Sequence, residues 1–430
     1  MSEPVVEATG PAVAATRPVV AVVDPFSTGA QLAPEFARRG WDAVAVLSTD
    51  QVPDSLLRHF TPEHFLAVLS SSDDDLAERL GAYAPKLVVV GSESGVHTAD
   101  RLAEELGLPG NGTELSPCRR DKYAMARRLA DQGVAAAASL ATDDLDELLD
   151  WADGHGHWPL VVKPLASAGS DSVTICADRD EARQAFAGII GQHDQMGGFN
   201  DRVLGQELLT GEQYFVNSVS RDGRHFIHEI WREQRVGVDG AVVYDYQDLL
   251  PADGATQRAL AEYVGRVLDA LGIHHGPAHS EVMLTPRGPV LIETGARLEG
   301  SVTSRGPQAA TGHSQVSLTV DAYTDPAGFA SLPGSEYRLD KHLRVVVLIA
   351  PADGHVDAVA LDEVRQLPSY LCGSTDALLP GTPVRRTVDL FSSPGHLYLV
   401  SDSRDQVERD YEQVRALERK ALYGSPDSGV

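Results

Sequence analysis

The chain has 430 residues, 43% of them hydrophobic, so it is long enough for two to four packed units with ordinary cores. Its 36 basic and 62 acidic residues give a formal charge of −26, which would repel nucleic acid and anionic lipid. No apolar stretch approaches the roughly 18 to 20 residues that cross a bilayer, and the acidic start lacks the cationic lead of a secretory signal. We therefore expect a cytoplasmic protein with no nucleic-acid or membrane partner.

The first part of the chain reads as a leader followed by an α/β unit. Residues 1–17 are small, polar and rich in Ala and Pro, which is typical of a disordered segment. From Pro18 onward, apolar runs (VVAVV, WDAVAVLS, KLVVV) alternate with helical patterns, and this alternation predicts a parallel sheet covered by helices. Ligands tend to bind at the carboxyl ends of such strands, so residues 24–29 and 91–95 are expected to border a pocket.

The middle and the end of the chain have a different pattern. A helix is expected from near Ser116 to Gly133, after which strands and hairpins predominate. The strand candidates after this helix are 159–163, 172–176, 202–209, 213–220, 224–233, 342–350, 384–391 and 396–401. The helix candidates are 180–193, 255–272 and 404–422. Cys118, Cys176 and Cys372 are far apart and odd in number, which favours isolated reduced thiols.

A hairpin at residues 278–293 is the most informative segment. Residues 286–288, Pro-Arg-Gly, suit a three-residue loop, and that register sets Glu281 directly across from Glu293 on one face. Two neighbouring carboxylates repel each other unless protons or cations lie between them, and Mg²⁺ prefers such hard oxygen ligands. A one-residue slip would instead turn one carboxylate to solvent, so on the hairpin alone both interpretations stay open.

Two lysines are candidate phosphate ligands. Lys163 ends an apolar strand and is followed by the small-residue loop LASAGSDS, whose backbone N–H groups could approach phosphate oxygens. The loop lacks the GK[ST] pattern, and a strand follows it rather than a helix, so it is not a Walker A loop. A solvated lysine beside an ordinary hairpin is the alternative, and Lys122 taken alone is also compatible with a surface charge.

Two glutamates and an arginine complete the candidates that the residues themselves suggest. Glu207 and Glu212 bracket the turn LLTG, and a hinge there would offer backbone groups to adenine and a carboxylate to ribose hydroxyls. Arg297 lies four residues beyond Glu293, and its planar donors suit a phosphoryl group or a carboxylate. Exposed glutamates at a turn and an unpaired surface arginine are the alternatives.

The order of the segments RRDK, VVKP with SAGS, QELLTGE, HSE and IETGAR resembles the ATP-grasp superfamily, in particular its bacterial carboxylate–amine ligases, which include the L-amino-acid (dipeptide) ligases. The resemblance runs from about Pro18 to Tyr323, and DPFSTG and GSESGV are similar to the amino-terminal domain of that family. It implies an α/β fold with α+β elements: a parallel-sheet domain, a mobile lid and a mixed-sheet part. The boundaries we expect are 1–17 for the leader, 18–118 for the amino-terminal domain, 119–205 for the lid, 206–325 for the Mg-ATP subdomain and 326–430 for a strand-rich end with a final helix.

The resemblance also implies roles for individual residues. The implied phosphate contacts are Lys122, Lys163 and the lid residues Ser167, Ala168, Gly169 and Ser170. The implied adenine and ribose contacts are Glu207, Leu208, Leu209 and Glu212. The implied magnesium ligands are Glu281 and Glu293, and the implied catalytic residues are Lys163 and Arg297. The candidate substrate contacts are Glu93, His279, Arg297 and Arg305. For His279 a place in the core is an open alternative.

One departure from the family pattern concerns the metal. Many ATP-grasp enzymes have Asn two residues after the second magnesium glutamate, whereas this sequence has Gly295, so a ligand would be lost or replaced by water.

The implied reaction uses ATP and Mg²⁺ to turn a carboxylate into an acyl phosphate, which an amine then converts to an amide. We expect a small-molecule carboxylate and a small-molecule amine as substrates, amino acids in particular, and a homodimer as the candidate assembly. The alternatives are an ATP-grasp carboxylase or another ligase that uses a different nucleophile, and a nucleotide-binding protein without catalysis.

Overall fold

The computed structural model describes residues 17–49, 57, 60–72, 75–167, 171–194, 198–238, 241–300, 303–332, 337–376, 378–389 and 392–424. Residues 1–16 of the expected leader and the expected lid residues Ala168, Gly169 and Ser170 lie outside these ranges. Within the described ranges, no helix combines the length and the apolar character needed to cross a membrane.

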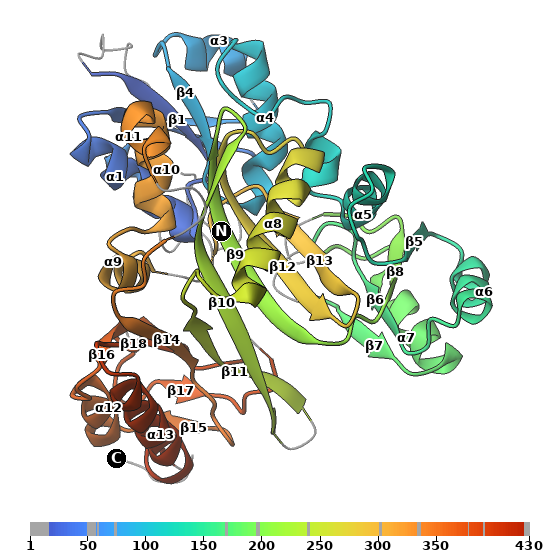
Figure 1. The fold of residues 1–430 in the computed structure, drawn as a ribbon, viewed down its shortest axis with the longest axis vertical. Coiled ribbons are helices and arrows are strands. Elements are labelled where there is room, and N and C mark those ends of the chain that lie inside the picture. Colours follow the sequence, from blue (N-terminus) through green and yellow to red (C-terminus); the bar gives the residue numbers. More distant parts are fainter. Residues whose placement is uncertain are drawn as a thin grey trace.

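The first unit is a four-stranded parallel sheet, as the alternating pattern predicted, with strand order β3-β2-β1-β4 (Figure 1). Its strands are β1 (Val19–Val23), β2 (Asp42–Leu47), β3 (Val68–Ser70) and β4 (Leu87–Val90). Its helices are α1 (Leu32–Arg38), α3 (Leu76–Gly81) and α4 (Val96–Glu105). β1 is buried along its whole length because helices cover both faces: α3 and α4 pack on one face, and α1 and a later helix, α10 (Gln315–Thr324), pack on the other.

The loops at the carboxyl ends of β1 and β4 are held tightly together. The buried carboxylate of Asp24 accepts a hydrogen bond from the backbone N–H of Ser48 at 2.7 Å and another from the hydroxyl of Ser94. A Cβ atom at Gly29 would lie 2.3 Å from the carbonyl oxygen of Gly91, so glycine is needed for this close approach. Hydrogen bonds and close backbone packing therefore hold together the two loops, residues 24–29 and 91–95, that the sequence predicted to border a pocket.

The part of the chain in which a lid is expected contains a second, smaller sheet with strand order β5-β8-β6-β7 and antiparallel pairing. Its strands are β5 (Ser139–Thr142), β6 (Leu160–Lys163), β7 (Thr174–Cys176) and β8 (Val203–Glu207). The helices α6 (Leu145–His155) and α7 (Arg179–Ile189) cover one face and share with the strands a core that contains Leu148 and Phe186. This core is separate from the other hydrophobic clusters, so the unit has a core of its own.

The third unit is an eight-stranded sheet with order β13-β12-β9-β10-β11-β14-β18-β16. Its strands are β9 (Glu212–Arg221), β10 (Arg224–Val238), β11 (Ala241–Leu249), β12 (Gly276–Thr285), β13 (Gly288–Gly295), β14 (His342–Val347), β16 (Tyr370–Gly373) and β18 (His396–Ser401). Its strand pairs are antiparallel, and the predicted mixed character is confined, in the described ranges, to a parallel bridge from Ala136 to Leu291 at the β13 edge. Helix α8 (Ala255–Ala270) packs on the outer face of this sheet, in a core that contains Ile230 and Tyr263.

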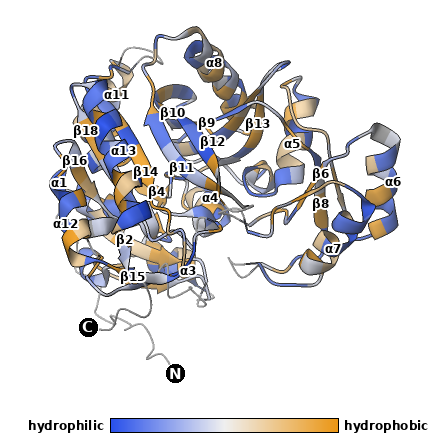
Figure 2. Ribbon diagram, turned by 90° about the horizontal axis from the view of Figure 1, so that it is seen from below, coloured by the Kyte–Doolittle hydropathy of each residue, from blue (hydrophilic) through white to orange (hydrophobic). Residues whose placement is uncertain are grey.

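The other face of the large sheet is polar and faces the lid and the loops. Figure 2 shows β10 as largely hydrophilic (blue) and β14 as largely hydrophobic (orange). The polar residues of this face include Gln213, Asn217, Glu229, Arg235, Gln247 and Glu281. So many hydrogen-bonding groups on one face of a sheet indicate a ligand site rather than a second hydrophobic layer.

The chain ends in a strand-rich part that also supplies three strands of the large sheet, β14, β16 and β18. Its other elements are α9 (Arg305–Thr311), α11 (Pro326–Ala330), α12 (Ala358–Arg365), α13 (Arg404–Lys420), β15 (Gly354–Val356), β17 (Pro383–Val384) and β19 (Tyr423–Gly424). The strand predicted for residues 384–391 is wrong as far as the described residues show, because after β17 the chain forms a loop, held by a hydrogen bond from the backbone N–H of Thr387 to the carbonyl of Ala350.

Candidate active site

A cavity of about 630 Å³ lies on the polar face of the large sheet, where it meets the lid and the strand-rich end. Its wall includes Ser27 from the first unit, Lys163 and Ser167 from the lid, and Val345 from β14. The volume lies in the range typical of ligand sites, and the wall combines apolar side chains with a few charged ones, as such sites do. Most of the residues predicted from the sequence lie on or next to this cavity.

Glu281 and Glu293 face each other across the β12–β13 hairpin and both line the cavity, which confirms the predicted pairing. The structure reaches this pairing by a different route. The turn has two residues, Pro286 and Arg287, instead of the predicted three. A β-bulge at Ile292 supplies the extra residue that brings Glu293 opposite Glu281. A bulge turns consecutive side chains to the same side, and Ile292 and Glu293 accordingly both line the cavity.

The two carboxylates have few cationic partners. Lys122 Nζ lies 2.8 Å from Glu293 Oε2, and Gln213 Nε2 donates to Glu281 Oε2 at 3.0 Å. Burial alone would raise the pKa of Glu281, but His279 and Arg235 hold it below its ordinary value. The carboxylate of Glu281 therefore stays ionised beside that of Glu293 at the wall of the cavity.

The two predicted lysines lie together at this end of the cavity. Lys122 is the first residue of α5 (Lys122–Asp131), and it also donates to the carbonyl of Ser167 at 2.6 Å. This helix begins later than the sequence predicted, because the side chain of Asp121 caps it and residues 116–119 form a separate 3-10 turn. Lys163, at the end of β6, is buried, and burial together with the nearby Lys122 lowers its pKa from 10.5 to about 8.

The hinge between lid and large sheet is held by a salt bridge. Glu207 pairs with Arg287 in the hairpin turn, and its Oε1 accepts the backbone N–H of Ala138 at 2.9 Å. Burial alone would raise the pKa of Glu207, but Arg287 holds it below the ordinary value. The carboxylate is thus occupied within the protein, while Leu208 and Leu209 line the cavity.

Arg297 lines the cavity, and a carboxylate behind it fixes its guanidinium group. Arg297 Nε donates to Glu93 Oε2 at 2.7 Å, and the other oxygen of Glu93 accepts from Arg120 at 2.7 Å. Burial alone would raise the pKa of Glu93, but the two arginines lower it from 4.5 to about 2. Glu93, predicted as a substrate contact, therefore lies one layer behind the residues that line the cavity.

The same contact gives a physical reason for Gly295. A Cβ atom at this position would lie 2.6 Å from Glu93 Oε2 and 3.1 Å from Arg297 Nε. An Asn side chain has no room there, because the Glu93–Arg297 ion pair fills the space. The departure from the family pattern is thus coupled to a glutamate of the first unit, 202 positions earlier in the chain.

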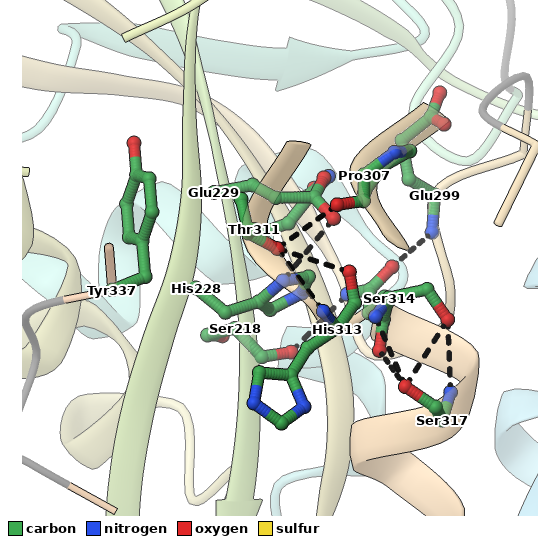
Figure 3. Close-up of polar contacts among 12 residues, drawn as sticks. Ser218, His228, Glu229, Glu299, Pro307, Thr311, His313, Ser314, Ser317 and Tyr337 are labelled. Carbon is green, nitrogen blue, oxygen red and sulfur yellow. Dashed lines mark hydrogen bonds and ion pairs between the residues drawn. The ribbon is translucent and has the colours of Figure 1, made fainter. Parts of the chain in front are cut away.

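His279 is held from below by a chain of buried polar groups. Its Nδ1 is 2.8 Å from Asn217 Oδ1, and Asn217 Nδ2 donates to Glu229 Oε2 at 2.8 Å. The carboxylate can only accept, so the amide oxygen of Asn217 must face the ring and Nδ1 carries the proton. Nε2 of His279 then faces Glu281 Oε1 at 3.7 Å. Figure 3 shows Glu229 beside His228 and Ser218 at the base of this chain.

Two predicted residues are not brought to the cavity. Glu212, at the start of β9, is exposed and accepts a hydrogen bond from the Tyr214 hydroxyl at 2.6 Å. Arg305, at the start of α9, is exposed, donates to the carbonyl of Leu371 at 3.3 Å, and borders a separate surface groove between α1 and α10.

Several cavity residues had not been singled out from the sequence. They are Asp171, Gln213, Arg235, Gln247, Glu299 and His396, whereas Ser27 lies in the segment 24–29 that was expected to border a pocket. The alternation of side chains along β10 and β11 could have placed Arg235 and Gln247 on one face of the sheet. His396 carries no such local signal: it is 115 positions from Glu281 in the sequence, and the pairing of β18 with β14 brings it to the cavity.

Comparisons with known proteins agree with this geometry. Residues 157–305 match the model of the ATP-grasp domain. Dapdiamide A synthase of Enterobacter agglomerans is 34% identical over 413 residues, which cover 92% of this chain and 95% of that protein. An L-arginine-specific L-amino acid ligase of Bacillus subtilis is 22% identical over 259 residues, 57% of this chain and 62% of that one. The fold is similar to that of an L-amino acid ligase from Bacillus licheniformis, with a TM-score of 0.72 at 18% identity over 94% of this chain and 98% of that one. The chain therefore belongs to the ATP-grasp family, as one of its amide-forming, ATP-dependent carboxylate–amine ligases.

Proposed function

We propose that the enzyme uses ATP and Mg²⁺ to convert the carboxylate of an amino acid or a similar small acid into an acyl phosphate, which an amine then converts to an amide. The observation that carries this proposal is the gathering of two paired carboxylates, two lysines and one arginine around a single cavity that ends at a hinge. Negative charge spreads over the transferred phosphoryl group, and fixed cations that face it lower the barrier.

Glu281 and Glu293 are the residues that would hold Mg²⁺. They are hard-oxygen donors on one face, they lie directly opposite each other, and Lys122 is the cation that pairs with Glu293 in the structure. When bound, the metal supplies Lewis-acid stabilisation to the phosphate oxygens of ATP. With Gly295 in place of Asn, we expect the remaining positions around it to be taken by phosphate and water.

The nucleotide would lie between the lid and the hairpin. Lys163 and Lys122 would contact the α- and β-phosphates, with Ser167 and the residues after it above the γ-phosphate. Leu208 and Leu209 would offer backbone groups to adenine, and Glu207 would act by holding the hinge to Arg287. A ribose contact for Glu212 requires that its carboxylate leave the hydroxyl of Tyr214, from which it accepts a hydrogen bond in the structure.

Arg297 would bind the transferred phosphoryl group and the acyl oxygen, with Glu93 fixing its orientation. A planar guanidinium group whose Nε is already paired presents its remaining N–H groups to the cavity in a fixed direction. His279 would contact substrate through Nε2. Arg305 could contact a substrate carboxylate in the cavity only if α9 moved, because in the structure it borders a separate groove.

The names of the relatives, a dapdiamide synthase and an arginine-specific L-amino acid ligase, support amino acids as substrates of this chain as well. The three cysteines are free in the structure, which fits the cytoplasm, where ATP is available. A homodimer remains the candidate assembly.

The experiment that tests the proposal is a screen of amino-acid pairs for phosphate release that depends on both substrates, with mass detection of the product. The expected product has the mass of the two substrates less one water. Binding of ATP without release of ADP or phosphate for any pair would contradict the proposal, and a product with an added CO₂ would favour a carboxylase.

A further inference from the structure

The second half of the proposed reaction needs a group that accepts a proton. An α-amine has an ordinary pKa of about 8, so near neutral pH most of it is protonated and cannot attack the acyl carbon. The four glutamates already assigned do not serve this purpose. Glu281 and Glu293 are assigned to the metal, Glu207 is paired with Arg287, and Glu93 has a pKa of about 2 and is a very weak base.

His396 lines the same cavity and has no assigned partner. No hydrogen bond to either of its ring nitrogens occurs in the described part of the chain, whereas His279 is tied to Asn217 through Nδ1. His396 is the first residue of β18. Helix α9 packs against β14, β16 and β18, so the loop that leads from Arg297 to α9 passes close to the start of β18 (Figure 1).

The backbone of His396 is clamped, which fixes the point on the cavity wall from which its side chain extends. Ser374 Oγ accepts the N–H of His396 at 2.7 Å and donates to its carbonyl at 3.1 Å. Gly395 has φ +145°, and a Cβ atom there would lie 2.1 Å from Ser374 Oγ, so only glycine allows this clamp. The ring also makes an edge contact with Tyr398, at 5.6 Å between centroids. A histidine held in this way at a cavity wall is preorganised for one direction of contact.

Glu299 is the charged group that acts on this ring among the described residues. Its backbone N–H donates to the Gln315 side chain at 2.8 Å, and Figure 3 shows its carboxylate pointing away from the Ser314 cluster. Tyr398 itself stays neutral, because burial raises its pKa well above the ordinary value. Burial lowers the pKa of His396 and Glu299 partly offsets this, so the imidazole is neutral at pH 7 and gains a counter-charge when it takes a proton.

Among the residues that the structure describes, the other elements that pack against the start of β18 add no further charge at this point. β14 and β16 pair with it through Val347 and Gly373, and α9 meets the neighbouring ring of Tyr398 at Gly306. α13 packs on the opposite face of the strand, in the cluster that contains Leu397 and Leu399.

We infer that His396 is the general base that deprotonates the incoming amine, with Glu299 stabilising the imidazolium. This inference rests on the proposed function. The ammonium nitrogen gives one proton to an imidazole nitrogen, and the freed lone pair forms the N–C bond at the acyl carbon. The C–O bond to phosphate then breaks, and the departing phosphate takes the second proton from nitrogen and leaves as HPO₄²⁻. The imidazolium returns its proton to solvent.

The test separates the two half-reactions. Hydroxylamine is a strong nucleophile that is unprotonated near neutral pH, so it traps the acyl phosphate without a base. In His396→Gln, hydroxamate formation from ATP and the carboxylate substrate should stay within about twofold of wild type. Amide formation with the amino-acid amine should fall about 10²- to 10⁴-fold in kcat, which is the usual contribution of a general base. The exposed His355→Gln is the matched control and should change neither rate.

The pH profile adds a readout that a structural role would not move. For wild type, amide formation should fall on the acid side with a pKa below 6.5, His396→Gln should lose this limb, and Glu299→Gln should shift it further down. Provided that the wild type forms hydroxamate, two results would overturn the inference. One is a rate of amide formation in His396→Gln within threefold of wild type, and the other is an equal loss of hydroxamate and amide formation in that variant. Absence of hydroxamate with wild type would instead refute the proposed function.

Discussion

Replacing Glu93 with Gln tests the ion pairs that hold Arg297 in place. Glu93 bridges Arg297 and Arg120 at 2.7 Å each, and its pKa is lowered from 4.5 to about 2. At neutral pH this lowering corresponds to roughly 3 kcal/mol in favour of the folded state. Gln keeps the volume but removes the charge, so the largely buried guanidinium groups of Arg120 and Arg297 lose the carboxylate that bridges them. We expect the free energy of unfolding to fall by about 2 to 3 kcal/mol.

The pH dependence of this effect has a definite sign. Because the pKa of Glu93 is lower in the folded state, its contribution is fully present above pH 4.5 and is lost as the pH falls toward 2. Urea unfolding followed by tryptophan fluorescence should show a constant difference between wild type and Glu93→Gln from pH 8 to pH 5, and a smaller one below pH 4.5. The exposed Glu78→Gln should differ from wild type by less than about 0.5 kcal/mol. Equal stability of Glu93→Gln and wild type at pH 7, or a difference that stays unchanged at pH 3, would refute this reasoning.

The same variant should also be slow in the first half-reaction. Arg297 loses its fixed orientation, so hydroxamate formation should fall at least about tenfold, mainly in kcat. Gly295→Ala should act in the same direction, since its Cβ would lie 2.6 Å from Glu93 Oε2 and displace the carboxylate. Unchanged kcat in both variants would mean that Glu93 does not position Arg297.

Three further predictions concern the nucleotide end of the cavity. Glu293→Gln should abolish ADP formation and leave the unfolding curve close to that of wild type. The exposed Glu262→Gln is the control and should behave as wild type in both assays. Near-normal turnover of Glu293→Gln would contradict the metal assignment. Arg287→Ala frees the carboxylate of Glu207, and the KM for ATP should rise severalfold with little change in kcat, so an unaltered KM would argue against the hinge. The pKa of Lys163 is lowered to about 8, so the lysine loses its charge above that pH. The value of kcat/KM for ATP should therefore fall between pH 7.5 and 9. A flat profile over this range would contradict the role of Lys163 as a phosphate ligand.

Local features of the site were predictable from the sequence. Glu281 and Glu293 lie in one hairpin, so the turn and the alternation of side chains placed them on one face. The sequence did not reveal that a bulge at Ile292, rather than a longer turn, makes the offset. Alternation of strands and helices likewise predicted the parallel first sheet.

The rest depends on contacts between distant segments. Glu93 and Arg297 are 204 positions apart, and neither residue carries a local sign that it meets the other. The same packing explains Gly295, which from the sequence alone was only a missing ligand. Arg305 was chosen for its charge, but its direction is set by α9, whose start faces the groove beside α1 instead of the cavity.

The central claim is that the carboxylate substrate itself attacks the γ-phosphate of ATP. It is tested most directly by supplying the carboxylate substrate found in the phosphate-release screen with both carboxylate oxygens labelled with ¹⁸O. If an acyl phosphate forms, the released phosphate should carry one ¹⁸O atom and the amide product should retain the other. Amide formation with unlabelled phosphate would contradict the mechanism, however well the residues around the cavity fit it.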